Sequence, residues 1–268
     1  MLEPSQLLLP DEEQLPAYET TFTSARSSPY CVLIPVLNEG ARIVRQLQGM
    51  RDAHLGIDIV VVDGGSTDGS VEPTYLQSEL GVGALLTKIG GGRLSAQLRI
   101  GMAWSLAHGY SGIVTIDGNG KDDFRAIPDF LVKLESGLDY VQGSRYLAGG
   151  VGENTPLDRE LAVRFIHAPL ISLGAGWHYT DTTNGFRGFS RRFLLDPRVR
   201  PFRSVFDTYN LHYYLAVRAP RLKYRVCEIP VSRRYPKSGP VPTKINHWGV
   251  KFHILKQTLV ASVGGYNP

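Results

Sequence analysis

The sequence is poor in cysteine and offers no cysteine or histidine pattern that suits a metal. Its two cysteines, Cys31 and Cys227, lie far apart in apolar runs that are typical of buried strands. The seven histidines are scattered, without a His-x-x-x-His spacing. The sequence therefore predicts no disulfide and no metal site of the common cysteine or histidine spacings.

Long apolar runs are also missing. No apolar stretch reaches the roughly 18 residues that a membrane-spanning helix needs. The first residues lack the basic region of a secretory signal, and their one apolar run, Leu7–Leu9, ends at Pro10. These absences predict a cytoplasmic protein, which can also lie at the inner face of the membrane.

Acidic residues are scarce in one part of the chain. Residues 1–181 hold 13 Lys and Arg against 22 Asp and Glu, whereas residues 182–268 hold 16 against 3. This imbalance predicts a basic face that meets an anion such as a phosphate group or an acidic membrane surface, and a solvated basic face is the plainer alternative. A nucleic-acid partner would rest on the isoelectric point of about 9.0 alone, so none is predicted.

What the sequence does have is an alternation of strand and helix patterns. Short apolar runs predict strands over residues 31–36, 57–63, 83–89, 112–117 and 138–144. Apolar residues at helical spacing predict helices over residues 41–50, 93–109, 127–137 and 206–217. This order favours a Rossmann-like α/β fold, in which a mainly parallel sheet is flanked by helices on both faces.

The chain divides into three predicted segments. Residues 1–29, rich in Pro, Ser, Thr and acids, form an N-terminal extension, residues 30–240 form the main domain, and residues 241–268 form a C-terminal helical tail. Within the tail, residues 245–263 carry apolar side chains near one helical face. This helix is expected either to lie on a membrane surface as a peripheral contact or to pack on the protein's own core.

Polar segments follow the predicted strands. They are residues 38–39, 63–64, 90–93, 117–123 and 143–145. Because ligands of parallel α/β sheets bind beyond the carboxyl ends of the strands, these segments are expected along one rim.

Two of these segments indicate an anion or a nucleotide. Asp63, at a strand end, can accept hydrogen bonds from a base or a ribose, or the residues after it can simply cap the next helix. Residues 91–93 precede a helix whose N-terminus can face an anion. As a dinucleotide fingerprint this segment fails, since Ser95 stands where the last glycine belongs, so a nicotinamide oxidoreductase is disfavoured.

Residues 115–123, TIDGNGKDD, carry a metal signal. Asp117 and Asn119 offer two oxygen ligands to a hard cation such as Mg²⁺. The alternative is a tight turn in which Lys121 offsets the two acids that follow it. Because Asn119 is neutral, such a site would hold a metal less strongly than a pair of carboxylates.

Basic side chains gather in segments that contain glycine or proline. The predicted phosphate ligands among them are Arg145, Arg187, Arg191, Arg233, Arg234 and Lys237. Arginine suits phosphate oxygens because its guanidinium can donate two parallel hydrogen bonds. For any one arginine, a structural pair with Asp181 or a surface position is the alternative.

The motifs IPVLNEG, VVDGGSTDGS, IDGNG, GSRYLAGG, DTTNGFRGFSRR and EIPVSRRYPKSG, in this order, resemble those of the family 2 glycosyltransferases. The resemblance covers roughly residues 30–240 and is closest to the dolichol-phosphate mannose synthase and polyprenyl-phosphate sugar transferase group. It implies a GT-A fold that binds a nucleoside diphosphate sugar together with Mg²⁺ or Mn²⁺ and transfers the sugar with inversion.

Carried over by position, the resemblance assigns roles to individual residues. The nucleotide sugar would be bound by Pro35, Val36, Asn38, Glu39, Asp63, Gly65, Ser66, Gly91, Gly92, Arg93, Asp117 and Gly118. Asp117 and Asn119 fall on the family's D-x-D metal motif, and Arg145 and Arg187 fall near the phosphates. Two departures concern the metal: Asn119 replaces the second acid, and Lys121, where relatives often have glutamine, can itself supply positive charge to the diphosphate.

Two chemistries remain open for the acceptor. A polyprenyl phosphate brings an anionic oxygen, so it needs a basic cradle rather than a base, and the predicted cradle is Arg187, Arg191, Arg233, Arg234 and Lys237. A glycan or small-molecule hydroxyl would need a base, for which Asp207 is the candidate, although Asp207 can also be a first-turn acid that faces a helix dipole. The predicted catalytic residues are Asp117, Arg145, Arg187 and Asp207. A nucleotide-sugar binder without activity is the third alternative, suggested by Asn119.

Overall fold

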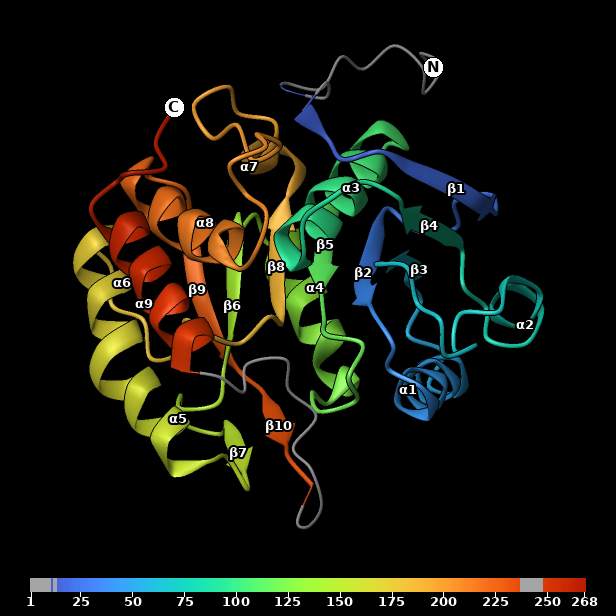
Figure 1. Ribbon diagram of the computed structural model, residues 1–268, viewed down its shortest axis with the longest axis horizontal. Coiled ribbons are helices and arrows are strands. Elements are labelled where there is room, and N and C mark those ends of the chain that lie inside the picture. Colours follow the sequence, from blue (N-terminus) through green and yellow to red (C-terminus); the bar gives the residue numbers. More distant parts are fainter. Residues whose placement is uncertain (1–10, 12–13, 237–247) are drawn as a thin grey trace.

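The computed structural model describes residue 11, residues 14–236 and residues 248–268. Within these residues, eight strands form one sheet (Figure 1). In the order in which they lie side by side, they are β1 (Tyr18–Thr23), β4 (Ala84–Lys88), β3 (Asp58–Asp63), β2 (Tyr30–Val36), β5 (Gly112–Thr115), β8 (Arg187–Ser190), β6 (Tyr140–Ser144) and β9 (Val226–Pro230).

The centre of the sheet is parallel, as predicted. Strands β4, β3, β2 and β5 run in one direction, and Val36 at the end of β2 lies opposite Asp63 at the end of β3. These strands consist mostly of Val, Ile and Leu residues that are fully buried. Such continuous apolar strands are typical of a sheet that is covered on both faces.

Strand β8 departs from the prediction. Residues 187–190, for which the sequence predicted no strand, form a strand that is antiparallel to both β5 and β6. Arg187 lies opposite Thr115 at the end of β5, and Ser190 lies opposite Gly112 at its start. The chain before β8 therefore lies at the carboxyl edge of β5, and the chain after β8 lies at the opposite edge.

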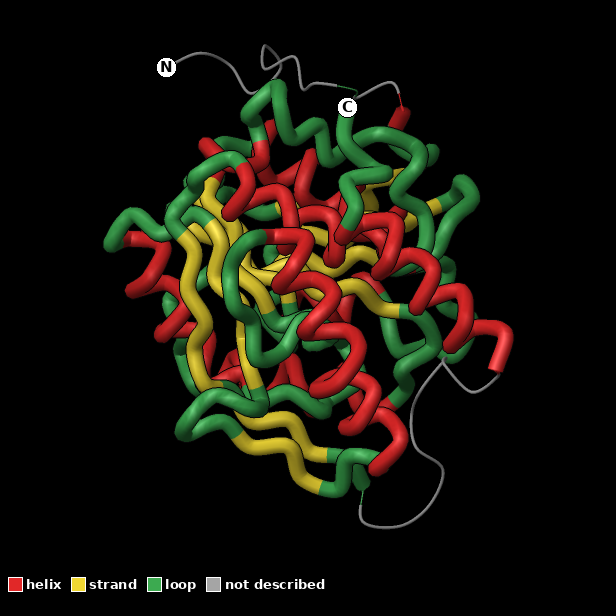
Figure 2. Tube along the Cα trace, turned by 90° about the vertical axis from the view of Figure 1, so that its left-hand side faces the viewer, coloured by secondary structure: helices red, strands yellow, loops and turns green. Residues whose placement is uncertain are grey.

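Helices cover both faces of the sheet. One face is covered by α1 (Ala41–Asp52), α2 (Pro73–Ser78) and α4 (Ile127–Glu135), and the other by α3 (Leu94–Ala107), α6 (Ala168–Ala175), α8 (Asn210–Arg221) and α9 (Trp248–Ser262). Each layer closes a separate apolar core against the sheet. Figure 2, which views the molecule from the left-hand side of Figure 1, shows helices in front of the strands.

Smaller elements complete the fold. They are η3 (Phe124–Ala126), α7 (Arg191–Leu194), and a two-stranded sheet of β7 (Val151–Glu153) and β10 (Ser232–Arg234). In addition, α5 (Leu157–Ala162) and the π-helix η4 (Val163–His167) run directly into α6. The sequence predicted no helix in this long segment.

The N-terminal extension is not a separate arm throughout. Residues 18–23 form β1, which pairs antiparallel with β4 and becomes an edge of the sheet. This segment forms a strand because Tyr18 and Phe22 alternate with threonines and a glutamate, a pattern that favours a strand. The overall composition of residues 1–29 does not reveal this pattern.

The predicted C-terminal tail is part of the main core. Helix α9 packs against α6 and α8, and it buries Ile254 and Ala261. Its other side exposes Phe252 and Leu259, and Val263, directly after the helix, is also exposed. In the described parts of the chain, no helix combines the length and the apolar character that crossing a membrane requires.

Candidate functional site

A cavity of about 1010 Å³ lies beyond the carboxyl ends of β2 and β5. Segments that the sequence analysis placed on one rim meet here: the loops after β2, β5 and β6 and the start of α3 all contribute lining residues. Helices α5, α8 and α9, the π-helix η4 and strand β10 complete the wall. The predicted rim thus forms one side of the cavity, and helices form the other.

The cavity is strongly basic. Its lining residues include eight Lys and Arg side chains against three Asp and Glu. The basic ones are Arg42, Arg93, Lys121, Arg145, Arg159, Arg187, Arg233 and Lys251, and the acidic ones are Glu39, Asp117 and Asp158. Such an excess of cations favours an anionic ligand.

The loops after β2 and β3 are fixed to each other and to α3. The Asn38 side chain accepts a hydrogen bond from the Thr67 N–H at 2.8 Å, and the Asn38 N–H donates to the Ser66 hydroxyl at 2.9 Å. The Gln97 amide of α3 donates to the carbonyls of Val36 and Val62, both at 2.8 Å. These bonds hold the floor of the cavity, of which Pro35 and Val36 are part, in one conformation.

Asp63 holds its own turn and does not line the cavity. Its carboxylate accepts hydrogen bonds from the Gly65 N–H at 3.1 Å, the Ser66 N–H at 3.0 Å and the Ser66 hydroxyl at 2.6 Å. Gly65 adopts a φ of 94°, a conformation that glycine tolerates best. Of the predicted nucleotide ligands, Asp63, Gly65, Ser66, Asn38, Gly91 and Gly92 are not among the lining residues, whereas Pro35, Val36, Glu39, Arg93, Asp117 and Gly118 are.

Asp117 lies at the centre of the site, directly after β5. Its carboxylate accepts a hydrogen bond from Arg233 Nη2 at 3.0 Å and from Asn119 Nδ2 at 3.2 Å. A Cβ atom on Gly185 would lie 2.8 Å from Asp117 Oδ1 and 3.6 Å from the His212 ring, so only glycine leaves these groups undisturbed. Burial would raise the pKa of Asp117, but the neighbouring Arg233 and Lys121 outweigh burial and lower it.

Arg233 joins Asp117 to a second buried acid. Its guanidinium forms ion pairs with both Asp117 and Asp122, and it lies over the Tyr235 ring. Asp122 Oδ1 has no hydrogen-bond partner among the described residues. Burial, as the largest effect, raises the pKa of Asp122 despite the nearby guanidinium.

Lys121 also lines the cavity and is only 6% exposed. Its ammonium lies 4.9 Å from the centroid of the Tyr235 ring, within the range of a cation–π interaction. Burial and the charge of Arg233 lower the pKa of Lys121 to about 8. The Tyr235 hydroxyl has its pKa lowered to about 8, because the surrounding Arg233, Lys121 and Arg159 outweigh the effect of burial.

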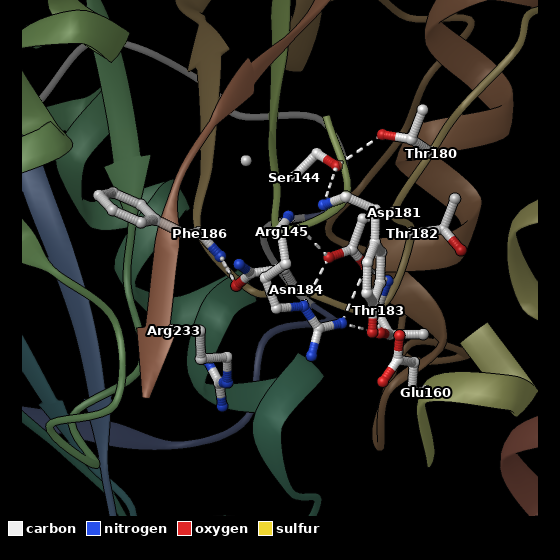
Figure 3. A network of polar contacts seen from close by, with 12 residues as sticks. Ser144, Arg145, Glu160, Thr180, Asp181, Thr182, Thr183, Asn184, Phe186 and Arg233 are labelled. Carbon is white, nitrogen blue, oxygen red and sulfur yellow. Dashed lines mark hydrogen bonds and ion pairs between the residues drawn. The ribbon is translucent and has the colours of Figure 1, made fainter. Parts of the chain in front are cut away.

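Arg145 is held in a buried ion pair (Figure 3). Its Nε and Nη2 atoms donate to the two carboxylate oxygens of Asp181 at 2.7 and 3.0 Å, and Nη2 also donates to the Thr183 hydroxyl at 2.8 Å. Burial would raise the pKa of Asp181, but the Arg145 guanidinium holds it below its usual value. The structural pair that the sequence left open thus exists, and it fixes a guanidinium in the cavity wall.

Arg187 lines the cavity, but its guanidinium is engaged by other groups of the protein. It is fully buried, and its guanidinium donates to the carbonyls of Asn184, Thr182 and His212 and to the Tyr140 hydroxyl. With four partners within the protein, this guanidinium ties the loop before β8 to α8. These bonds fix the cavity wall at this point, and the predicted contact of Arg187 with a phosphate stays a prediction.

Three other predicted site residues lie away from the cavity. Arg191 follows β8 and donates to the carbonyls of Leu106 and Tyr110, at the edge of the sheet opposite the site. Arg234 is half-exposed and pairs with Glu153 and Asp123. Asp207, the predicted base, is exposed and does not line the cavity, although its carbonyl accepts the Arg93 N–H at 2.6 Å. Lys237 lies outside the described residues.

The cavity contains residues that the sequence analysis missed. His212 and Tyr209 come from the start of α8, Arg159 and Ile166 from the long helical segment, and Lys251 from α9. His212 is buried, and its Nε2 atom has no partner in the part of the chain that the structure describes. Burial, followed by the charge of Arg187, lowers the pKa of His212 well below its usual value. The one sequence signal available was the spacing of apolar residues along 157–166.

The donor set around Asp117 does not fit a divalent cation. Asn119 turns its N–H groups toward Asp117, and its oxygen accepts the Lys121 N–H at 3.2 Å. The carboxylate itself is paired with Arg233, and Lys121 stands beside it. Among the residues that the structure describes, no three His, Cys, Asp or Glu side chains form a group that could hold a metal. Magnesium and calcium sites depend on oxygen ligands with negative charge, which these two cations cancel.

Several known proteins are similar to this chain. Polyprenol monophosphomannose synthase of Mycolicibacterium smegmatis is 27% identical over 230 residues, which are 84% of this chain and 84% of that protein. Undecaprenyl-phosphate mannosyltransferase of Micrococcus luteus is 29% identical over 204 residues, which are 75% of this chain and 81% of that protein.

Solved structures show the same fold. A crystal structure of glucosyl-3-phosphoglycerate synthase from Mycobacterium tuberculosis has a TM-score of 0.60 at 17% identity, covering 88% of this chain and 80% of that one. Another structure of that synthase, in complex with Mn²⁺ and UDP, has a TM-score of 0.59 at 17% identity and covers 88% and 78%. This likeness confirms the predicted GT-A fold.

The family model described as glycosyl transferase family 2 matches residues 31–196. The match covers more than half of the chain and contains the parallel centre of the sheet together with Asp117, Lys121 and Arg145. The chain belongs to glycosyl transferase family 2.

Proposed function

We propose that the protein transfers a sugar from a nucleoside diphosphate sugar to a polyprenyl phosphate, with inversion at the anomeric carbon. The observation that carries this proposal is the composition of the cavity wall, in which eight basic side chains adjoin an apolar wall formed by helices. The names of two relatives, a polyprenol monophosphomannose synthase and an undecaprenyl-phosphate mannosyltransferase, support the same acceptor class.

The donor would occupy the side of the cavity at the carboxyl ends of β2 and β5. There Pro35, Val36 and Gly118 bring backbone close to the cavity, and Arg93 stands at the start of α3. Arg145, held by Asp181, presents a fixed guanidinium on the wall. Fixed cations of this kind stabilise the negative charge that develops on the departing diphosphate.

The acceptor would occupy the side formed by the helices. Val163 and Ile166 of η4 and Phe252 and Leu255 of α9 line the cavity there and suit a prenyl chain. Lys251 of α9 and Arg159 of α5 line the same side and suit its phosphate.

The ion pairs of the lining carboxylates favour a phosphate acceptor over a hydroxyl acceptor. Glu39 pairs with Arg42 at 2.9 Å, Asp117 with Arg233 at 3.0 Å, and Asp158 with Lys251 at 2.7 Å. A carboxylate that is paired with a cation is a weak base, whereas an attack by a phosphate oxygen needs no base.

In the proposed reaction, a phosphate oxygen of the acceptor attacks the anomeric carbon on the face opposite the diphosphate. The new carbon–oxygen bond forms while the bond to the nucleoside diphosphate breaks. The acceptor's phosphate and the donor's diphosphate are both anions and repel each other. The cations of the cavity wall therefore also help to bring donor and acceptor together. The side chains of this protein therefore bind, orient and neutralise charge, and no proton has to be removed.

A peripheral contact with a membrane is part of this proposal. Exposed apolar side chains continue from the cavity along α5, η4, α6 and α9, which lie together at one side of the molecule (Figure 1). They are Leu157, Leu161, Phe165, Ile166, Leu173, Phe252, Leu259 and Val263, and we call them the apolar face. A lipid surface is the occupant that suits this face, since a polyprenyl phosphate would reach the cavity from it. The cytoplasmic side stays a prediction from the sequence.

A hydroxyl acceptor is the second candidate, and His212 rather than Asp207 is the base that the geometry offers it. The His212 ring lines the cavity near Asp117, and its Nε2 atom lacks a partner among the described residues. However, burial and Arg187 lower the pKa of His212, which makes it a poor base at neutral pH.

Incubation of the full chain with labelled nucleoside diphosphate mannose or glucose and a short-chain polyprenyl phosphate tests the proposal. The expected product is a lipid phosphate that carries the sugar with inverted anomeric configuration. Transfer to free glycans alone, abolished by His212→Asn, would instead establish the hydroxyl candidate.

A further inference from the structure

The loop after β5 is paired with strand β10 beside Asp117. The Arg234 N–H donates to the Lys121 carbonyl at 2.8 Å, and the Asp123 N–H donates to the Ser232 carbonyl at 2.9 Å. Because of this pairing, the side chains of Lys121 and Arg233 both reach the cavity wall. Lys121 is 6% exposed and Arg233 7% exposed, so both cations are largely removed from water.

These cations occupy the surroundings in which a metal would have to bind. Arg233 contacts Asp117 and Asp122, and Lys121 lies near the same two carboxylates. The four charges cancel without any metal. A divalent cation would therefore meet one carboxylate already bound to a guanidinium, next to an ammonium that repels it.

The neutral ligand of the predicted metal site is also engaged. The Asn119 amide donates to Asp117, and its oxygen accepts the Lys121 N–H. Both polar ends of Asn119 therefore brace the loop. In this arrangement Asp117 and Asp122 orient Arg233, and Asn119 orients the backbone that carries Lys121.

We propose that the Lys121 ammonium and the Arg233 guanidinium bind the donor's diphosphate directly, so that nucleotide binding and sugar transfer by this chain need no divalent metal. The inference rests on the proposed function, because it assigns the anion that the pair binds. Buried cations suit this task, since a charge-assisted hydrogen bond to phosphate is stronger where water is excluded.

Calorimetric titration of the full chain with UDP and with GDP tests this inference without any turnover. The titrations are run once in excess EDTA and once in Mn²⁺. The expected dissociation constants agree within about twofold, since the fixed cations supply the charge that a metal would bring. This comparison uses the wild-type chain, so it does not depend on how any variant folds.

Two variants sharpen the test. Lys121→Gln should weaken nucleotide binding about 10- to 100-fold in EDTA, the loss expected for one hydrogen bond to a charged group. Lys133→Gln makes the same chemical change on the exposed side of α4 and should leave binding unchanged. The double variant Asn119→Asp with Lys121→Gln gains a carboxylate and loses the ammonium, so its nucleotide binding should become dependent on Mn²⁺.

The outcomes separate this inference from the proposed function. Nucleotide binding that appears only with Mn²⁺, together with transfer to polyprenyl phosphate, overturns the inference and keeps the function. Equal binding in EDTA and Mn²⁺ without transfer to any polyprenyl phosphate supports the inference and overturns the acceptor. Absence of binding by either nucleotide under both conditions overturns the inference and the donor site alike.

Discussion

Removing two aromatic rings from the apolar face should release the protein from membranes. Phe165 lies on η4 and is 71% exposed, and Phe252 lies on α9 and is 72% exposed. Phe252 also lines the cavity, and Ile166, the neighbour of Phe165, does so as well. The perturbation is the double variant Phe165→Ser with Phe252→Ser, which leaves the buried side of both helices unchanged.

The size of the effect follows from the exposed area. Full transfer of a phenylalanine side chain out of water is worth about 1.5–3 kcal/mol, so a ring that is seven-tenths exposed contributes about 1–2 kcal/mol. The two rings together contribute about 2–4 kcal/mol. This corresponds to a loss of vesicle binding of roughly 30- to 1000-fold.

Co-sedimentation with anionic vesicles at low salt measures this loss. The matched control is Val132→Ser on α4, which removes a residue that is 61% exposed on the other helical layer. Its binding should equal that of the wild-type chain. Equal co-sedimentation of the double variant and the wild type would refute the assignment of the apolar face, as would a wild-type chain that does not bind vesicles.

Three further variants test the framework of the site. Asp181→Asn should destabilise the fold by about 3–5 kcal/mol in urea unfolding at pH 7, because Arg145 would keep a buried charge without its partner. Since Arg145 lowers the pKa of Asp181, the difference in unfolding free energy from wild type should shrink as the pH falls below about 4. A difference that stays constant with pH would contradict this reasoning. Asp63→Ala should lower the free energy of unfolding by about 1–3 kcal/mol, while nucleotide affinity changes less than twofold. A loss of affinity without a loss of stability would instead support the base or ribose contact predicted from the sequence. Gly185→Ala should lower transfer about tenfold or more with a nearly unchanged melting temperature, since its methyl group would press on the Asp117 carboxylate; unchanged transfer would show that this carboxylate can move freely.

Apolar periodicity was sufficient to predict the centre of the fold. The strands from 31–36 to 112–117 are continuous Val, Ile and Leu runs, and the helices over 41–50 and 93–109 repeat apolar residues at helical spacing. Both signals arise from burial against one sheet, which is a property of each element by itself. The prediction that the loops after the strands share one rim followed from the parallel direction of the strands alone. Asp117 was found because it begins one of these loops.

The roles of the arginines could not be predicted in the same way. Arg187 and Arg191 are four residues apart in one motif, and strand β8 separates them. Because β8 is antiparallel to β5, Arg187 lies at the carboxyl end of β5, whereas Arg191 lies at the other end. Strand direction is set by pairing between distant segments, and the pattern of a single sequence carries little information about that pairing. The sequence predicted both arginines as phosphate ligands because of their shared motif, and of the two only Arg187 lines the cavity.

The position of Arg233 relative to Lys121 could not be predicted from the sequence either, because it also depends on strand pairing. Each belongs to a short loop motif, and the sequence predicted phosphate binding for Arg233 and a turn or diphosphate role for Lys121. Their common position near Asp117 follows from the pairing of residues 121–123 with β10. The pairing brings Arg233 to a loop that already contains Lys121 and three acids.

The apolar face was hidden from the sequence analysis for a physical reason. A helix that buries one side and exposes apolar residues on the other has a weak apolar periodicity. This is the case in α6, which ends the helical segment 157–175, and in α9. These two helical segments line the cavity on the side opposite the strand ends and also form the exposed apolar surface. One set of helices thus joins a surface suited to lipid with a cavity suited to phosphate. A lipid phosphate meets both requirements at once, because its chain can remain in the membrane while its headgroup reaches the cations beside Asp117.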